Sequence, residues 1–165
     1  MNTILRTPPA GTLAISEDGL ARLRERMRRL DKEILPALRE RLVSPDGDGR
    51  DDEALAMALV ERARVGWVLA TARPSEELPD DPDVVELGDW IMVRDDEGAV
   101  EVYRIVDPIE APMDSVRVSS SSPLAQAALC RRVGDVIEVG PERGERFRLT
   151  ILASSRRGFD ESLPL

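Results

Sequence analysis

The sequence predicts an α+β protein, in which an N-terminal antiparallel helical hairpin precedes a small β-sheet domain that carries one helix. Apolar residues recur every three or four positions over residues 20–72 and at every second position over residues 84–152. The acidic, proline-containing segment SEELPDDPD separates the two patterns. We therefore expect four parts: a coiled-coil hairpin over residues 1–76, a linker over 77–83, a C-terminal domain over 84–154 and a tail over 155–165.

The first helix is expected to begin after Ser16, which is a suitable N-cap. Leucine, isoleucine and methionine then form a narrow apolar stripe over residues 20–42, as is typical of a coiled coil. Pro36 lies inside this stripe and lacks a backbone N–H, so we expect it to kink the helix or loosen one turn without ending it. Residues 1–15 contain two prolines and a glycine near their middle and are expected to form an irregular leader.

The second helix is predicted from about Asp51 to Ala72, and Arg73-Pro74 ends it. Between the helices lies the stretch SPDGDGRDDE, residues 44–53, whose proline and glycines stop the first helix. Two helices joined by so short a turn must lie antiparallel, so this stretch is the tip of the hairpin. Five of its ten residues are acidic.

The C-terminal part predicts a sheet with one helix. Ser122 is the expected N-cap of the helix and Pro123 its first residue, and the helix ends before Gly134. Alternating apolar residues predict five strands, at residues 84–93, 100–106, 116–118, 136–139 and 147–152.

Composition excludes several classes of function. The chain has 165 residues and a net charge of -9, which argues against a bulk nucleic-acid binder. It contains no histidine, which removes histidine-based triads, histidine general bases and most zinc sites. Cys130 is the only cysteine, so no intramolecular disulfide is possible. Without a long apolar run or a signal-peptide core, we expect a cytoplasmic protein with no membrane partner.

Acidic clusters are the remaining candidates for chemistry, and the sequence has three of them. The turn at residues 94–98 has ordinary hairpin-turn chemistry, and the linker acids at residues 76–83 are expected to be a solvated spacer. The tip differs from both. Helix capping and the helix dipole explain acids at residues 51–53, but they leave Asp46 and Asp48 as excess charge.

Carboxylates at the end of a rod are plausible ligands for a hard cation such as Mg²⁺. Calcium binding of the EF-hand type is excluded, because the twelfth position counted from Asp46 is Met57 and not glutamate. The first helix, in contrast, carries eight basic against four acidic residues, which leaves +4. These charges fit either a solvated helix flank or a basic shaft behind an acidic tip, suited to a channel that holds nucleic acid and metal.

Several segments resemble the bacterial Gre transcript-cleavage factors, GreA and GreB. The stretch VSSSSPLAQAALCRRVGDVIEV is similar to the family's Ser-Pro helix, Gly-Asp turn and valine-rich strand, and VELGDWIMV and VEVYRIV resemble the strands before it. Leucines and the mid-helix Pro36 match the pattern of the family's first helix. The resemblance spans roughly residues 16–154.

The resemblance implies a factor that binds RNA polymerase, inserts its coiled coil into the secondary channel and promotes cleavage of backtracked transcripts. It places Asp48 and Asp51 at the family's two essential acids, which help hold Mg²⁺ at the polymerase active site. The factor then has no cofactor of its own and is not itself an enzyme. It meets the nascent RNA 3′ end only indirectly, and we expect a monomer. Asp46, Asp52 and Glu53 would support the tip.

In the family the C-terminal domain is FKBP-like and docks on the polymerase. The resemblance implies docking by residues 119–131, including Ser122, Pro123 and Leu124.

The tip departs from the family pattern at Gly49, Asp51, Asp52 and Leu55, where the family has Leu, Glu, Asn and Tyr. This leaves a second reading open, a Gre-like inhibitor that occupies the same channel without stimulating cleavage. A prolyl isomerase and a plain coiled-coil adaptor are the alternatives from other classes. The near absence of aromatic residues disfavours the isomerase.

Overall fold

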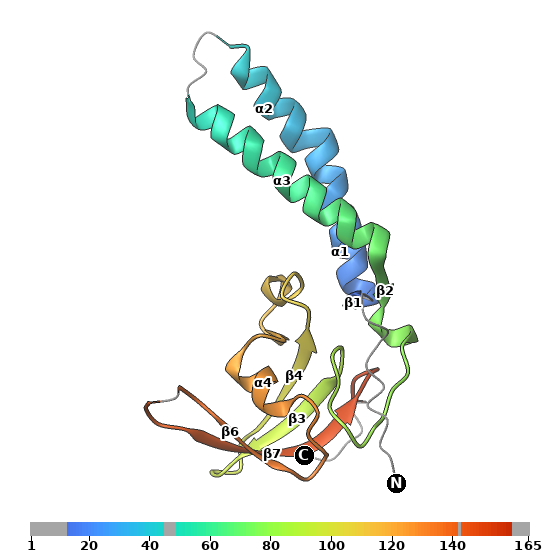
Figure 1. Cartoon of the computed structure of the whole chain (residues 1–165), viewed down its shortest axis with the longest axis vertical. Helices are drawn as coiled ribbons and strands as arrows, with labels where there is room; N and C mark the ends of the chain where they lie inside the picture. The colour runs from blue at the N-terminus through green and yellow to red at the C-terminus, as the bar shows by residue number, and fades with distance from the viewer. Residues whose placement is uncertain (1–12, 45–48, 142, 160–165) are drawn as a thin grey trace. The chain divides into compact units, whose positions relative to one another are not determined.

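A computed structural model describes residues 13–44, 49–141 and 143–159, and the remaining residues are left out of the description (Figure 1). The chain divides into two compact units. One is helical and comprises Glu17–Ala72, and the other combines the residues up to Ser16 with those from Arg73 onward. Across the described residues, no helix is long and apolar enough to cross a membrane.

The helical unit consists of two antiparallel arms (Figure 1). The first arm contains α1 (Glu17–Arg29), a π-helical turn (Leu30–Ile34) and α2 (Leu35–Leu42), and the second arm is α3 (Gly49–Thr71). Pro36 accounts for the π-helical turn, because it has no N–H to continue the normal hydrogen-bond ladder. Leu35 instead donates its N–H to the carbonyl of Leu30, five residues back. The expectation that Pro36 loosens one turn without ending the helix is confirmed.

Apolar contacts and cross-arm ion pairs hold the arms together. Leu30, Leu35 and Ala58 form a buried cluster between the arms, and full burial of a leucine contributes about 1.5–3 kcal/mol. Arg26 binds Glu61 through two hydrogen bonds of 2.6 and 2.8 Å. Such half-exposed pairs contribute only about 0–1 kcal/mol each, so the buried cluster dominates the packing of the arms.

The sheet of the other unit has five strands in the order β5-β4-β3-β7-β6. Neighbouring strands are antiparallel except β4 and β5, which are parallel. Helix α4 (Pro123–Ala128) contributes Ala125 and Ala128 to the core that it shares with the sheet. The strands are β3 (Trp90–Asp95), β4 (Val100–Val106), β5 (Arg117–Ser119), β6 (Val136–Val139) and β7 (Phe147–Ser155).

The five predicted strands are all present, but the first, third and last have different bounds, and the third is shifted by one residue to Arg117–Ser119. The strand predicted over residues 84–93 begins only at Trp90, because Gly88 has a φ of 98° and turns the chain before it. Val85 is nevertheless fully buried and bonds to the segment after α4. The last strand continues to Ser155 instead of ending at residue 152.

The segments on either side of the helical unit pack within the sheet-containing unit. Strand β1 (Leu13–Ile15) pairs with β2 (Ala72–Pro74), and Ser16 donates its N–H to Glu110 at 3.1 Å. The expectation of an irregular leader is therefore wrong for residues 13–15, because Ala14 and Ile15 are buried. The predicted domain boundaries at residues 76, 83 and 154 stay a prediction.

Candidate functional site

The acidic tip is described only in part. Asp46 and Asp48 lie outside the described residues, whereas Asp51, Asp52 and Glu53 lie at the start of α3. At this position their negative charges face the positive end of the helix dipole, which stabilises the helix by about 0.3–1 kcal/mol per residue. The structure thus places Asp51 and Asp52 in the first turn of α3, as the helix-dipole argument predicted.

The three described acids differ in their surroundings. Asp51 faces the first arm, where its Oδ1 lies 3.9 Å from Nη1 of Arg41, and its side chain is only 21% exposed. Asp52 and Glu53 are exposed and have no hydrogen-bond or ion-pair partner within the described part of the chain. The carboxylate of Asp51 is therefore turned toward the first arm, while its two neighbours face solvent.

The described tip acids suit a hard cation by donor type, since carboxylate oxygen is the ligand that Mg²⁺ prefers. They do not assemble a complete ligand set: among the described residues, the one group of three close carboxylates is Asp80, Glu86 and Asp89, in the sheet-containing unit. The described part of the tip therefore offers carboxylate oxygens but no complete ligand set.

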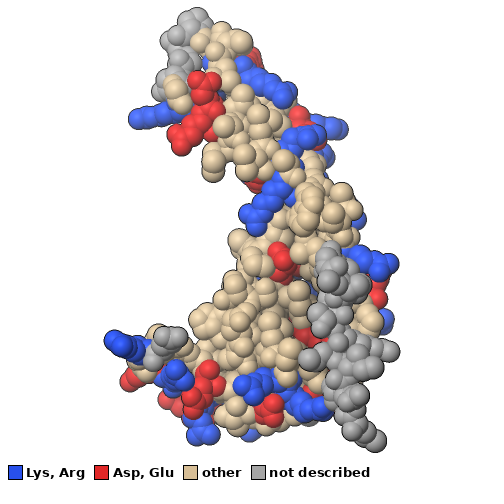
Figure 2. Space-filling view, viewed as in Figure 1, with Lys and Arg blue, Asp and Glu red and all other residues tan. Residues whose placement is uncertain are grey.

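The basic side chains of the first arm are largely paired. Figure 2 shows basic and acidic side chains interleaved along the visible face of the helical unit. Arg24, Lys32 and Arg39 have no ion-pair partner among the residues described. Of the eight basic side chains that suggested a basic shaft, only these three carry a charge that no described acidic residue pairs. The paired cations are Arg22, Arg26, Arg28, Arg29 and Arg41.

The start of α4 carries the three residues expected to dock on the polymerase. Ser122 caps the helix, because its Oγ accepts a hydrogen bond from the N–H of Ala125 at 3.2 Å. Leu124 is half-buried and packs against the core, whereas Pro123 is exposed. The predicted N-cap and the proline at the first helical turn are confirmed.

A buried ionic cluster links the beginning and end of the sheet-containing unit. Asp89 is fully buried and accepts a hydrogen bond of 2.5 Å from Nε of Arg156. The same guanidinium donates to Glu86 at 3.1 Å and to the carbonyl of Ser75 at 2.9 Å. Burial raises the pKa of Asp89, and the bond to Arg156 opposes this rise. Asp80 lies close to both carboxylates.

Arg156 supplies the cation that the close carboxylates of this cluster require, so we assign the cluster a structural role. Arg104 extends it by donating to Glu76 at 2.6 Å and to the carbonyl of Gly88 at 3.2 Å. The expectation of a solvated linker is wrong for Glu76, whose side chain is 22% exposed.

The acidic turn between β3 and β4 is structural, as predicted. The Oδ1 atom of Asp95 accepts hydrogen bonds from the N–H groups of Glu97 and Ala99, at 2.9 and 2.8 Å. Gly98 has a φ of 92°, which favours glycine.

Sequence reasoning missed Arg41 beside Asp51 and the buried pair of Asp89 and Arg156. Arg156 was missed because it comes just after the last predicted strand, in a segment rich in Ser, Arg and Gly. Such a composition is typical of a frayed chain end. Arg104 could have been found more easily than Arg156, because it is a charged residue among the mainly apolar residues of the second half of β4.

Comparison with known proteins finds a family match in the C-terminal part of the chain. Residues 79–156 match the family model described as "Transcription elongation factor, GreA/GreB, C-term". The transcription elongation factor GreA of Thermotoga sp. strain RQ2 is 29% identical over 146 residues, which cover 82% of this chain and 93% of that protein. GreB of Pseudomonas aeruginosa is 28% identical over 151 residues, or 85% of this chain and 90% of that protein. The crystal structure of Thermus aquaticus Gfh1 is 24% identical, covers 88% of this chain and 99% of that one, and has a TM-score of 0.40.

The sheet-containing unit, which matches the family model over residues 79–156, has the features of a GreA/GreB C-terminal domain. Over more than four fifths of its length, the chain is similar to the transcription elongation factors GreA and GreB.

Proposed function

We propose that this protein binds bacterial RNA polymerase during elongation, inserts its helical hairpin into the secondary channel and promotes cleavage of backtracked transcripts. The observation that carries the proposal is the group of acids at the start of α3, at the end of the hairpin opposite Glu17 and Ala72, in a chain similar to GreA and GreB. At about 1.5 Å per residue, α3 is roughly 35 Å long, which is a suitable reach for a channel probe.

In this role the chain supplies carboxylates and the polymerase supplies the rest of the active site. Asp48 and Asp51 would ligate Mg²⁺ at the polymerase, with Asp46, Asp52 and Glu53 as supporting charge. Such a metal stabilises the charge that develops on the scissile phosphate and lowers the pKa of the attacking water.

Arg41 does not prevent Asp51 from acting in this way. The two charges are 3.9 Å apart and Arg41 is 70% exposed, so their attraction is worth about 0–1 kcal/mol. Asp51 can therefore turn from Arg41 to a metal at small cost. Arg24, Lys32 and Arg39 face solvent on the same arm and suit a channel that contains nucleic acid.

The finer features follow from the same proposal. The two arms act as a coiled coil, and the sheet-containing unit is FKBP-like and docks on the polymerase by the surface that includes Ser122, Pro123 and Leu124. The protein works as a cytoplasmic monomer, is not an enzyme by itself and meets the nascent RNA only near its 3′ end.

The test adds the protein to stalled, backtracked elongation complexes and measures RNA length. Shortened RNA that disappears with the double variant Asp48→Ala, Asp51→Ala supports the proposal. The matched control is Asp96→Ala with Glu97→Ala, which removes two exposed acids from the turn between β3 and β4 and should leave cleavage unchanged. A protein that does not bind the polymerase would refute the proposal.

The second candidate function is inhibition of the polymerase through the same channel. It is favoured by Asp51, whose side chain is one methylene shorter than the glutamate that the resemblance places at this position. A displacement near 1 Å can reduce the rate of a positioned reaction about 100-fold. Slower RNA synthesis without shortened transcripts would support inhibition and exclude cleavage stimulation.

A further inference from the structure

Strand β6 is an edge of the five-stranded sheet, and none of the described strands pairs with its outer side. The N–H of Ile151 on β7 bonds to the carbonyl of Asp135, and Ile137 lies opposite Leu149 two residues further along. Backbone groups alternate in direction along an antiparallel strand, so the N–H and C=O groups of Val136 and Glu138 point away from β7. An open edge of this kind is a template for another strand.

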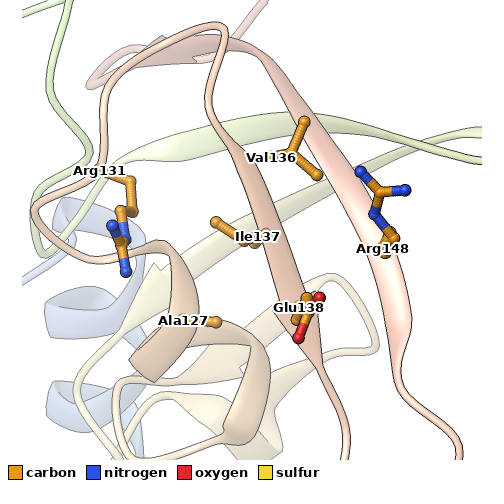
Figure 3. A pocket seen from close by; sticks show the side chains of 6 residues that line it. All are labelled: Ala127, Arg131, Val136, Ile137, Glu138 and Arg148. Carbon is orange, nitrogen blue, oxygen red and sulfur yellow. The ribbon is translucent and has the colours of Figure 1, made fainter.

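A groove of about 440 Å³ runs along this edge (Figure 3). This volume falls in the range of ligand pockets, roughly 300–1,000 Å³. On one side the groove is bounded by Ala127 of α4 and by Arg131 in the segment after it, and on the other by Val136, Glu138 and Arg148 from the sheet. The edge is therefore flanked by side chains that could contact an added strand on both of its faces.

The two faces of the groove differ in a way that the strand register defines. Ile137 is buried and packs toward α4, so the next residue on either side points to the opposite face. Val136 is 52% exposed, and Glu138 and Arg148 are directly opposite each other in the register. Arg131 thus lies on the α4 face and Arg148 on the other, as Figure 3 shows.

The charges of the groove are mainly positive. Glu138 lies 3.5 Å from Arg146, which balances its charge. Arg131 and Arg148 are exposed, and neither guanidinium has a hydrogen bond or ion pair with any residue placed by the structure. Two exposed arginines that form no ion pair with a described residue thus lie beside this strand edge, in a chain whose net charge is -9.

We propose that the β6 edge binds an extended acidic segment of a partner protein, which adds to the sheet as a further strand. The backbone of the segment pairs with Val136 and Glu138, and its carboxylates bind Arg131 and Arg148. In this mode the main-chain bonds provide affinity and the side-chain contacts provide specificity.

The geometry predicts a pattern in the bound segment. Successive side chains of a strand point to opposite faces, and Arg131 and Arg148 lie on opposite faces. The positions of the two carboxylates in the segment must therefore differ by an odd number, as in residues i and i+1 or i and i+3. Carboxylates at an even separation would both point to the same face, and one arginine would remain without a partner.

The test uses the full chain and two fluorescein-labelled peptides of equal composition, made of valine and threonine with one pair of glutamates. One peptide has the glutamates at an odd separation and the other at an even separation, and binding is followed by fluorescence anisotropy. We expect the odd-spaced peptide to bind at least about tenfold more tightly, because only this spacing gives both arginines a carboxylate as a charged hydrogen-bond partner. In amide hydrogen exchange, the N–H groups of Val136 and Glu138 should become protected when the odd-spaced peptide binds.

Arg131→Glu and Arg148→Glu should each weaken binding about tenfold or more, since each replaces an attraction with a like-charge contact. The matched control is Arg94→Glu, because Arg94 is an exposed strand arginine that is not part of the groove. No binding of the odd-spaced peptide, or equal weakening by all three variants, would overturn the proposal. Protection of the same two amides in the protein alone, with a dimer in sedimentation, would assign the edge to a second copy of the chain and would also overturn it.

Discussion

Replacement of Arg156 with methionine is expected to destabilise the sheet-containing unit strongly. The guanidinium is 4% exposed and bonds to Asp89, Glu86 and the carbonyl of Ser75. Methionine fills much of the same space but leaves Asp89 buried without its cation. Removing one partner of a buried ion pair costs about 3–5 kcal/mol, which is a large share of the roughly 5–15 kcal/mol that stabilises a typical domain.

Urea unfolding followed by tryptophan fluorescence can measure this loss. Trp67 lies in the helical unit and Trp90 in β3, so a Trp67→Phe background leaves Trp90 as the reporter of the sheet-containing unit. At an m-value of about 1–3 kcal/mol/M, the transition midpoint should fall by about 1 M or more. The control Arg94→Met removes an exposed arginine from β3, the strand that carries Trp90, and should leave the midpoint nearly unchanged.

The pH dependence of the unfolding free energy tests whether the buried charge of Asp89 causes the destabilisation. Burial raises the pKa of Asp89 in the folded state, and loss of Arg156 should raise it further. A folded-state pKa above the unfolded value means that the folded protein holds the proton in the window between the two, so stability decreases as pH rises through that window. The deficit of Arg156→Met should therefore shrink as the pH falls from neutral toward the unfolded pKa of Asp89. A loss below about 1 kcal/mol, or a deficit that does not change with pH, would refute this reasoning.

Three further substitutions test local features. Gly66→Ala should stabilise the helical unit by up to about 1 kcal/mol in thermal melts, because alanine favours helix and the added Cβ meets only the flexible end of Met27, at 3.0 Å; a lower melting temperature would contradict this. Gly88→Ala should destabilise the other unit by about 2 kcal/mol or more in urea, since φ is 98° and the added Cβ would lie 2.8 Å from Cβ of Ser75; an unchanged midpoint would show that the turn can relax. Ser122→Ala should cost about 1 kcal/mol through loss of the cap of α4, and a neutral effect would mean that Pro123 alone defines the helix start.

Local periodicity was sufficient to predict the helical unit. The stripe of leucines and the short turn at residues 44–53 required two antiparallel arms, and the missing N–H of Pro36 required an irregular turn near Leu30. These features depend on bonds and contacts between residues close in sequence. Segment bounds in the other unit were harder to predict, because residues 84–89 alternate like a strand while Gly88 turns the chain.

The tip acids show the same difference between what local sequence predicts and what tertiary packing decides. The sequence indicated that residues 44–53 hold more negative charge than capping requires, and this does not depend on where each carboxylate points. Only the packing of the arms turned Asp51 toward Arg41 and left Asp52 and Glu53 exposed. Asp46 and Asp48 lie outside the described residues, so their role stays a prediction.

By itself, the sequence determined the two helical arms, the five strands of the sheet in their order along the chain, the acidic tip and the resemblance to the Gre factors, because each depends on local pattern and composition. The tertiary structure alone decided which charges are buried together and which backbone groups remain open. Asp89 and Arg156 are separated by many residues and meet only when β3 and β7 pair. The arginines of the β6 groove likewise come from the segment after α4 and from a neighbouring strand. Burial and long-range pairing arise from the whole fold, so no local pattern in the sequence encodes them.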